Sequence, residues 1–145
     1  MYRIVVLLVV IAGALLVACG PGAPSDSGAP RPTKVSITLS EFKIETPQTM
    51  FKVGVPYQFV VTNKGTLNHD FSISPPVMAG MAGMSASDVH EGALAVIDAK
   101  DMPPGATKTI DVTFSKPYSS TDLEIACHTP GHYEAGMQVP ITVTP

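Results

Sequence analysis

Between Lys34 and the C-terminus, apolar and polar side chains alternate with a period of two residues, with one interruption at 75–91. This period places the apolar side chains on one face of a β-strand, and turn-forming Gly, Pro and Asn residues separate the runs. The apolar positions that define the expected strands are Val35, Ile37 and Leu39; Phe42 and Ile44; Tyr57, Phe59 and Val61; Phe71 and Ile73; Leu94 to Ile97; Ile110, Val112 and Phe114; Leu123 to Cys127; and Val139, Ile141 and Val143. The pattern predicts an all-β chain of seven to eight strands packed as a β-sandwich around one core.

The N-terminal segment has a different pattern. A positive charge at Arg3 precedes Ile4 to Leu16, an apolar run that is short for a membrane span and fits the core of an export signal. The following Leu-Val-Ala-Cys sequence resembles a bacterial lipobox, in which Cys19 is lipidated and becomes the mature N-terminus. The alternative is an uncleaved N-terminal anchor. We predict an exported lipoprotein with a signal peptide at 1–18, held on a bacterial cell membrane and facing the periplasm or the cell exterior.

Composition divides the remaining chain into a tether and one domain. Residues 19–33 are rich in Pro, Gly and Ser and contain almost nothing to bury, which is typical of a flexible linker. Residues 34–145 contain all the strand patterns and are sufficient for a single domain. The net charge of the 145 residues is −3 and no basic cluster occurs, so we expect no nucleic-acid partner.

The cysteine count makes Cys127 informative. The chain has two cysteines, and if Cys19 carries a lipid then Cys127 has no partner for a disulfide. An unpaired thiol in an oxidising compartment is a hazard unless it is buried or bound to a metal. Metal ligation therefore explains why this thiol is present.

The sequence around Cys127 supplies further metal donors at the spacing C-x4-H-x4-M, with His132 and Met137. Thiolate, imidazole and thioether donors suit copper, and two His and one Cys with a weak axial Met form the blue-copper arrangement. Pro130-Gly131 is expected to turn the chain so that one loop supplies three donors. His69 is the candidate for the second His, because it adjoins a predicted strand that holds it rigidly.

These motifs resemble those of the cupredoxins, the superfamily of plastocyanin and azurin. The resemblance depends on Asn63-x-Gly65, on His69-Asp70-Phe71 and on the C-x4-H-x4-M segment, and it covers 34–145. It implies a Greek-key β-sandwich with one type 1 copper ion per chain. The implied copper ligands are His69, Cys127, His132 and Met137. Two residues depart from the pattern of this superfamily. Asp70 stands where many relatives have Asn. His128 directly after Cys127 is unusual, and we expect it to lie on the opposite face of the strand without binding the metal.

The interruption at 75–91 is expected to be an excursion between strands, with a short helix around Ser87 to Gly92. Its methionines follow the spacing M-x-x-M-x-x-M, at Met78, Met81 and Met84. This spacing resembles copper(I)-transport motifs, but we favour a flexible hydrophobic loop. A second, weak copper site that includes His90 is a hypothesis.

We predict a membrane-tethered electron carrier that passes single electrons between exported redox proteins. Cytochrome or oxidase-type partners are expected to dock near His132, whose ring edge should face outwards. The alternative is a copper chaperone or storage protein with the same fold. We expect no enzymatic activity, because the chain lacks a catalytic acid, base or nucleophile set and a second Cys for a binuclear copper centre.

Overall fold

The computed structural model describes residues 31–77, 90 and 92–145. The signal peptide, most of the tether, the lipidation site Cys19 and the M-x-x-M-x-x-M segment lie outside these residues. The helix expected around Ser87 to Gly92 also falls largely outside them. Within the described ranges, no helix has the length and apolar character needed to cross a membrane.

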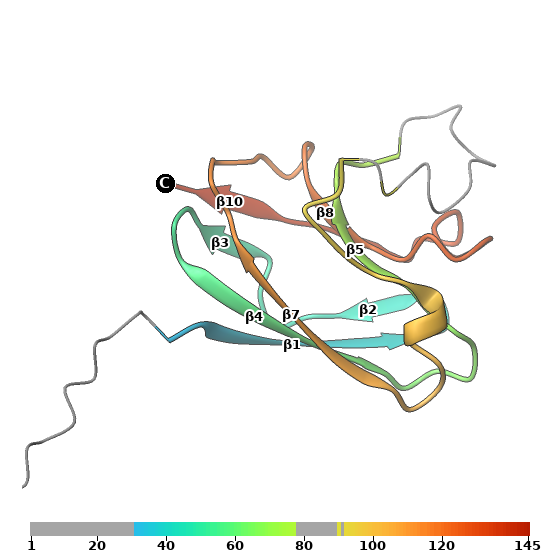
Figure 1. Ribbon diagram of the computed structural model, residues 1–145. Coiled ribbons are helices and arrows are strands. Elements are labelled where there is room, and N and C mark those ends of the chain that lie inside the picture. Colours follow the sequence, from blue (N-terminus) through green and yellow to red (C-terminus); the bar gives the residue numbers. More distant parts are fainter. Residues whose placement is uncertain (1–30, 78–89, 91) are drawn as a thin grey trace, which may run out of the picture.

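The described residues form ten β-strands and one 3-10 helix (Figure 1). The elements are β1 (Thr33–Ser40), β2 (Lys43–Glu45), β3 (Met50–Lys52), β4 (Pro56–Asn63), β5 (Phe71–Ser74), β6 (Ala95–Ile97), η1 (Ala99–Asp101), β7 (Thr107–Thr113), β8 (Glu124–Ala126), β9 (Gln138–Pro140) and β10 (Thr142–Thr144). The prediction of an all-β chain is therefore confirmed.

The strands pair into two four-stranded sheets and a short ribbon. One sheet has the order β2-β1-β4-β7, with β1 parallel to β4 and β7 antiparallel to it. The other has the order β6-β5-β8-β9 and is antiparallel throughout. The ribbon pairs β10 with β3 in parallel. Figure 1 shows the two larger sheets as separate layers, which is the predicted sandwich.

A single hydrophobic core fills the space between the layers. Every second residue of β1 and β4 is buried there, as the alternation predicts. An aromatic cluster lies at its centre, where the ring of Phe51 is 5.6 Å from that of Phe59 and 5.5 Å from that of Phe114. This core gives the strand ends a rigid support.

The structure has more strands than predicted because short strands carry little pattern. Strand β3 buries only Phe51, between two exposed residues, so it shows no alternation to recognise. The run from Val139 to Val143 divides into β9 and β10, which join different sheets. Phe42, which we expected in a strand, lies in the turn between β1 and β2 with φ +58° and is 52% exposed.

The outer face of β5 and β8 carries a buried polar layer. Three polar residues of these strands are buried, although they alternate with the core residues and so lie on the other face of the sheet: Ser72, Ser74 and Glu124. The hydroxyl of Tyr133 donates a hydrogen bond of 2.6 Å to Glu124 Oε1. Burial raises the pKa of the Glu124 carboxyl above its usual 4.5, although this hydrogen bond acts in the opposite direction.

Replacing Glu124 with Gln should make the thermal stability less sensitive to pH. A carboxyl with a raised folded-state pKa contributes stability below its unfolded pKa of 4.5, and this contribution is lost as pH rises through the folded pKa. Glu124→Gln should therefore raise the Tm of the metal-free protein by roughly a few degrees at pH 7. Thermal unfolding should show a smaller gain at pH 4.

The matched control is Glu45→Gln, at an exposed carboxylate whose pKa is lowered by its hydrogen bond to Lys43. This variant should lower the Tm slightly at pH 7 or leave it unchanged. A lower Tm for Glu124→Gln than for the wild type at pH 7 would contradict the prediction.

Candidate metal centre

Strand register brings His69 and Cys127 to the same end of the sandwich. Strands β5 and β8 are antiparallel with Ser72 opposite Ala126. His69 lies two residues before β5, and Cys127 is the first residue after β8. If the same register continues for a few residues beyond the strands, it brings the His69 and Cys127 side chains together, although 58 positions separate them in the sequence.

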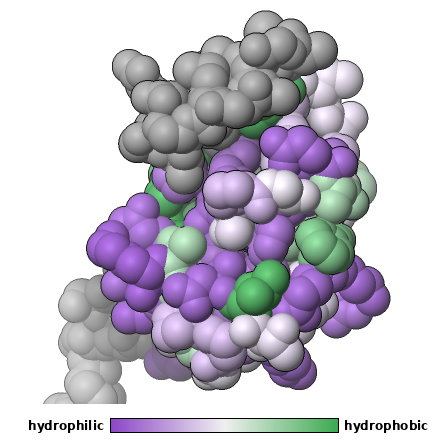
Figure 2. Space-filling model, turned by 90° about the vertical axis from the view of Figure 1, so that its right-hand side faces the viewer, coloured by the Kyte–Doolittle hydropathy of each residue, from purple (hydrophilic) through white to green (hydrophobic). Residues whose placement is uncertain are grey.

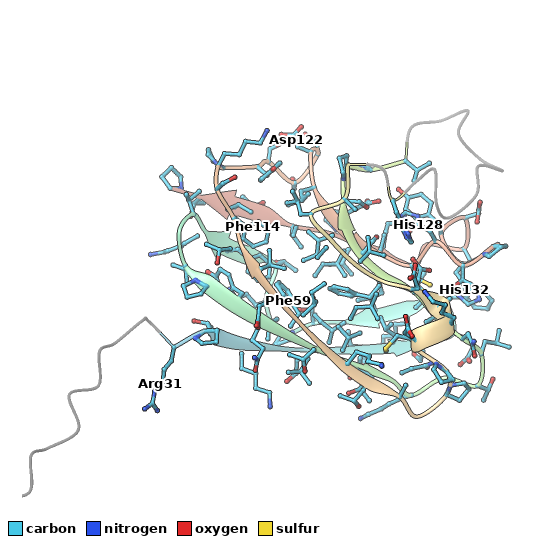
Figure 3. The ribbon with its side chains drawn as sticks, viewed as in Figure 1. Arg31, Phe59, Phe114, Asp122, His128 and His132 are labelled. Carbon is cyan, nitrogen blue, oxygen red and sulfur yellow. The ribbon has the colours of Figure 1, made fainter. Side chains whose placement is uncertain are left out.

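The loop from Cys127 to Met137 closes on itself and presents His132 at this end of the molecule (Figure 3). Gly131 has φ +83°, a conformation that favours glycine, and the next backbone N–H donates to the Thr129 carbonyl over 2.9 Å. The Met137 N–H donates to the His132 carbonyl, and the Cys127 N–H donates to the Met137 carbonyl, both over 3.0 Å. The predicted turn at Pro130-Gly131 is therefore present.

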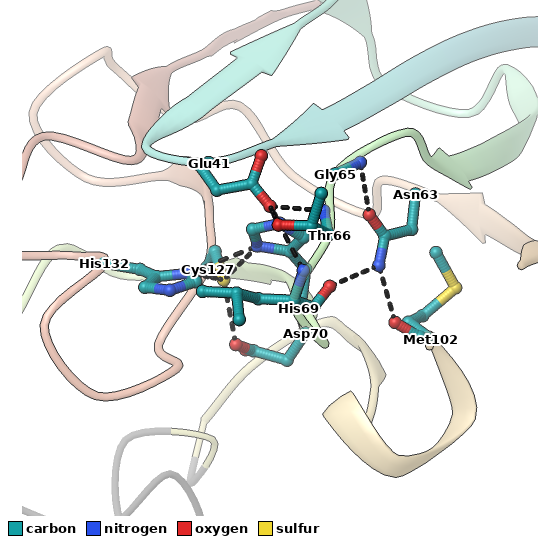
Figure 4. Close-up of polar contacts among 10 residues, drawn as sticks. Glu41, Asn63, Gly65, Thr66, His69, Asp70, Met102, Cys127 and His132 are labelled. Atoms are coloured by element: carbon teal, nitrogen blue, oxygen red, sulfur yellow. Dashed lines mark hydrogen bonds and ion pairs between the residues drawn. The ribbon is translucent and has the colours of Figure 1, made fainter. Parts of the chain in front are cut away.

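Three potential donor atoms meet within this frame (Figure 4). His69 Nδ1 lies 3.1 Å from His132 Nδ1, and Cys127 Sγ lies 3.7 Å and 3.6 Å from these two nitrogens. All three side chains are buried. Bonds from nitrogen and sulfur to a metal are about 2.0–2.3 Å long, so donors that share one ion lie roughly 3–4 Å apart. The observed separations match this requirement.

The chemistry of the donor set selects the metal. One sulfur and two imidazole nitrogens in a buried cluster fit a single type 1 copper site. Met137 is fully buried, and its backbone is bonded to both Cys127 and His132. Its role as a copper ligand stays a prediction. Among the described residues, this is the one group of three or more His, Cys, Asp or Glu side chains arranged to hold a metal.

Burial sets the protonation of two of the donors, Cys127 and His69, in the absence of metal. Burial, with a smaller contribution from the neighbouring Asp70 charge, raises the pKa of the Cys127 thiol to about 12. Burial also lowers the pKa of His69, with a smaller contribution from His132. The imidazole of His69 is therefore neutral at pH 7, and a metal ion that binds here displaces the thiol proton.

Asp70 organises the segment that follows Cys127. Its Oδ1 accepts hydrogen bonds from the backbone N–H groups of His128 and Thr129, both 2.7 Å, and from the Thr129 hydroxyl at 3.1 Å. The Cys127 thiol donates to the same oxygen over 3.2 Å. The other carboxylate oxygen of Asp70, Oδ2, lies 3.2 Å from His90 Nε2. The Asp70 side chain therefore contacts the sulfur directly.

His128 lies outside the donor group, as predicted. Its ring stacks on that of Tyr133 with a centroid distance of 5.0 Å, and its Nε2 lies 3.5 Å from the Ser74 hydroxyl. It therefore belongs to the buried polar layer on the outer face of the sheet.

The ring of His132 is covered more than we expected. The residue is only 4% exposed, and the ring of Phe42 packs edge-on against it with a centroid distance of 5.4 Å. The exposed aromatic at this end of the molecule is Phe42. The sequence did not reveal this arrangement, because Phe42 continues the alternation of a strand pattern.

The loop before His69 is held by two polar side chains. Asn63 Oδ1 accepts from the Gly65 N–H over 2.8 Å, and its Nδ2 donates to the Leu67 carbonyl over 2.8 Å. From the turn between β1 and β2, Glu41 Oε1 accepts from the Thr66 N–H and hydroxyl and from the Leu67 N–H. These bonds, led by the one from the Thr66 backbone, lower the pKa of Glu41 to about 2.

Several solved structures share this architecture. Auracyanin from Roseiflexus castenholzii matches with a TM-score of 0.61 at 21% identity, over 78% of this chain and 98% of that one. Auracyanin A from Chloroflexus aurantiacus, a blue copper protein, gives a TM-score of 0.57 at 15% identity, over 79% and 100%. Rusticyanin from Thiobacillus ferrooxidans gives 0.58 at 16% identity, over 79% of each. The chain has the cupredoxin fold.

A sequence relative also has a connection with copper. The copper-resistant cuproprotein CopI of Pseudomonas aeruginosa is 26% identical over 140 residues, which cover 77% of this chain and 76% of that protein. No protein-family model matches the chain. The cupredoxin fold and the group of His69, Cys127 and His132 together fit one type 1 copper ion.

Proposed function

We propose that this protein is a membrane-tethered blue copper carrier that passes single electrons between exported redox proteins. The buried group of His69, Cys127 and His132 carries the proposal, because two nitrogens and one sulfur face one another within 4.8 Å. A copper ion bound there supplies a one-electron couple between Cu(I) and Cu(II).

The frame around the donors suits fast electron exchange. The two oxidation states of copper prefer different geometries, so donors that move freely add a reorganisation barrier to each transfer. Here the donors lie at strand ends and in a loop that is closed by backbone hydrogen bonds. Asp70 also fixes the segment after Cys127. These contacts keep the donor atoms nearly in place whichever charge the metal carries.

The decisive experiment is a visible spectrum and a voltammogram of the copper-loaded protein. An intense absorption band from sulfur-to-copper charge transfer, together with a reversible one-electron wave, supports an electron carrier. A colourless protein that binds copper without a reversible wave would overturn the proposal.

Met137 is proposed as the weak fourth ligand. Met137→Leu should keep copper bound and raise the reduction potential, because loss of the thioether removes electron density that stabilises Cu(II). We expect a rise of about 60 mV or more, which corresponds to a tenfold change in the relative affinity for the two oxidation states. Met102→Leu makes the same change at another buried methionine and should leave the potential unchanged.

Partner docking is proposed at the end of the molecule that carries His132, with Phe42 as the central contact. Figure 2 shows this end with isolated hydrophobic side chains among hydrophilic ones. Phe42 and Leu67 are 52% and 50% exposed there. A small apolar contact with a polar surround fits a transient complex with a cytochrome or oxidase-type protein.

Phe42→Ser should slow electron transfer to a cytochrome partner about tenfold without changing the reduction potential, because an exposed aromatic is a typical interface hot spot. Stopped-flow kinetics with a soluble c-type cytochrome would measure this rate. The control is Leu94→Ser, which removes an exposed apolar side chain next to β6, near the end of β5 remote from His69. Equal rates for both variants would place the docking surface elsewhere.

The membrane anchor is proposed from Cys19 and the apolar run before it. Mass spectrometry of the exported protein should find a chain that begins at a lipidated Cys19. An unmodified mature chain in the soluble fraction would contradict this.

A copper chaperone or storage protein is the second candidate function. The similarity to a copper-resistant cuproprotein favours it, since a resistance protein binds copper without necessarily passing electrons. Transfer of Cu(I) to a competing chelator or partner protein, from a colourless form of the chain, would support this candidate over the first.

A further inference from the structure

The ring of His69 has a second nitrogen, Nε2, for which no described residue serves as a hydrogen-bond partner. His69 is fully buried, and its Nε2 lacks a hydrogen bond within the described part of the chain. The other nitrogen, Nδ1, faces the sulfur of Cys127 and Nδ1 of His132. A neutral imidazole that binds a metal through Nδ1 carries its proton on Nε2. When His69 binds a metal through Nδ1, its Nε2–H group is therefore buried and has no hydrogen-bond acceptor among the described residues.

The carboxylate of Glu41 lies close to this nitrogen. Its Oε1 lies 4.0 Å from His69 Nε2, and Figure 4 shows the Glu41 side chain next to the His69 ring. This distance is longer than a hydrogen bond. The Glu41 side chain is 33% exposed, so the contact is an interaction between a partly solvated charge and a buried N–H dipole. Because Thr66 and Leu67 donate to the same oxygen, the carboxylate has a fixed place beside the ring.

Gly65 provides the space in which the carboxylate and the ring approach each other. A Cβ atom at this position would lie 2.6 Å from Glu41 Oε1 and 2.8 Å from His69 Nε2. Both distances are too short for real contacts, so any side chain at Gly65 would separate the pair. The Asn-x-Gly motif of the sequence therefore serves this contact as well as the turn.

We propose that Glu41 is a positioning residue for the copper site, which holds the His69 proton on Nε2 and favours Cu(II) over Cu(I) through its negative charge. Carboxylates that orient a metal-binding histidine through its second nitrogen are common in metalloproteins. The proposal rests on the proposed copper function, because it assigns a role to Glu41 in that same site.

The first test uses the metal-free protein. Nitrogen-15 NMR of the His69 ring reports which nitrogen carries the proton. The wild type should be predominantly the Nε2–H tautomer, and Glu41→Ala should contain an Nδ1–H fraction at least threefold larger. The same tautomer ratio in both proteins would overturn the positioning role.

The second test compares affinities for Cu(II) and Cu(I) by competition with chelators. Glu41→Gln keeps an oxygen that can accept from Thr66 and Leu67 but removes the charge. It should bind Cu(II) about tenfold more weakly than the wild type and Cu(I) with nearly unchanged affinity. The control Glu45→Gln removes the same charge from an exposed site on β2 and should match the wild type. Equal Cu(II) affinities for Glu41→Gln and Glu45→Gln would overturn the electrostatic role.

These tests separate the proposal from the function on which it rests. If the proposed electron-carrier function is wrong, the copper-loaded wild type should lack the blue absorption band. The tautomer ratio and the dependence of Cu(II) affinity on Glu41 require no colour and no redox partner. The wild type could therefore lack the band while its Cu(II) affinity still depends on Glu41. In that case Glu41 keeps its positioning role, and the copper site has a function other than electron transfer.

Discussion

Cys127→Ser should abolish both the visible absorption band and the reversible redox activity of the copper-loaded protein. A serine hydroxyl does not supply the soft thiolate on which the absorption band and the electronic coupling depend. Serine is close to cysteine in size, and its hydroxyl can donate to Asp70 Oδ1, to which the thiol now donates over 3.2 Å. The fold should therefore survive the change.

Absorption spectroscopy and voltammetry of the copper-loaded variant measure this effect, and circular dichroism checks that the fold is retained. The alternative outcome is informative. A Cys127→Ser protein with a reversible blue chromophore would show that the metal binds elsewhere, and the assignment of the site would be wrong.

Asp70→Ala should destabilise the metal-free protein by about 2–5 kcal/mol, because it leaves the buried N–H of His128 and the partly buried N–H of Thr129 without an acceptor. Asp70 is only 2% exposed, so water does not easily replace it. Asp70→Asn keeps an oxygen for these donors and should cost roughly 1 kcal/mol or less. Chemical denaturation of both variants measures the difference.

The pair of variants distinguishes the acceptor from the charge. If Ala and Asn destabilise the protein equally, the hydrogen bonds from His128 and Thr129 contribute little and the carboxylate charge is the important feature. The expected order, with Asn close to the wild type, would explain why a carboxylate is tolerated where the cupredoxins often have Asn.

The fold was predictable wherever a strand was long enough to show its alternation. Strands β1 and β4 bury Val35, Ile37, Leu39, Tyr57, Phe59 and Val61 as the sequence pattern predicts. Strand β3 was missed, because a three-residue strand with one buried side chain has no period. The division of the C-terminal run into two strands depends on which sheet each half joins, which no local pattern encodes.

The donors were predictable because their chemistry and spacing are local. Cys127 and His132 lie five residues apart in one loop, and His69 adjoins a recognisable strand. The supporting residues were not predictable in the same way. Asp70 reaches the segment after Cys127 only through the register of β5 and β8, and Glu41 reaches His69 only through the turn between β1 and β2.

The high pKa of the Cys127 thiol has a consequence for the life of the protein before copper arrives. With a pKa of about 12, almost none of the metal-free protein carries the reactive thiolate at pH 7. The metal-free chain therefore resists crosslinking to neighbouring molecules and attack by peroxides. Burial of Cys127 therefore has two effects: copper must displace the thiol proton in order to bind, and the metal-free protein is protected from oxidation until it does.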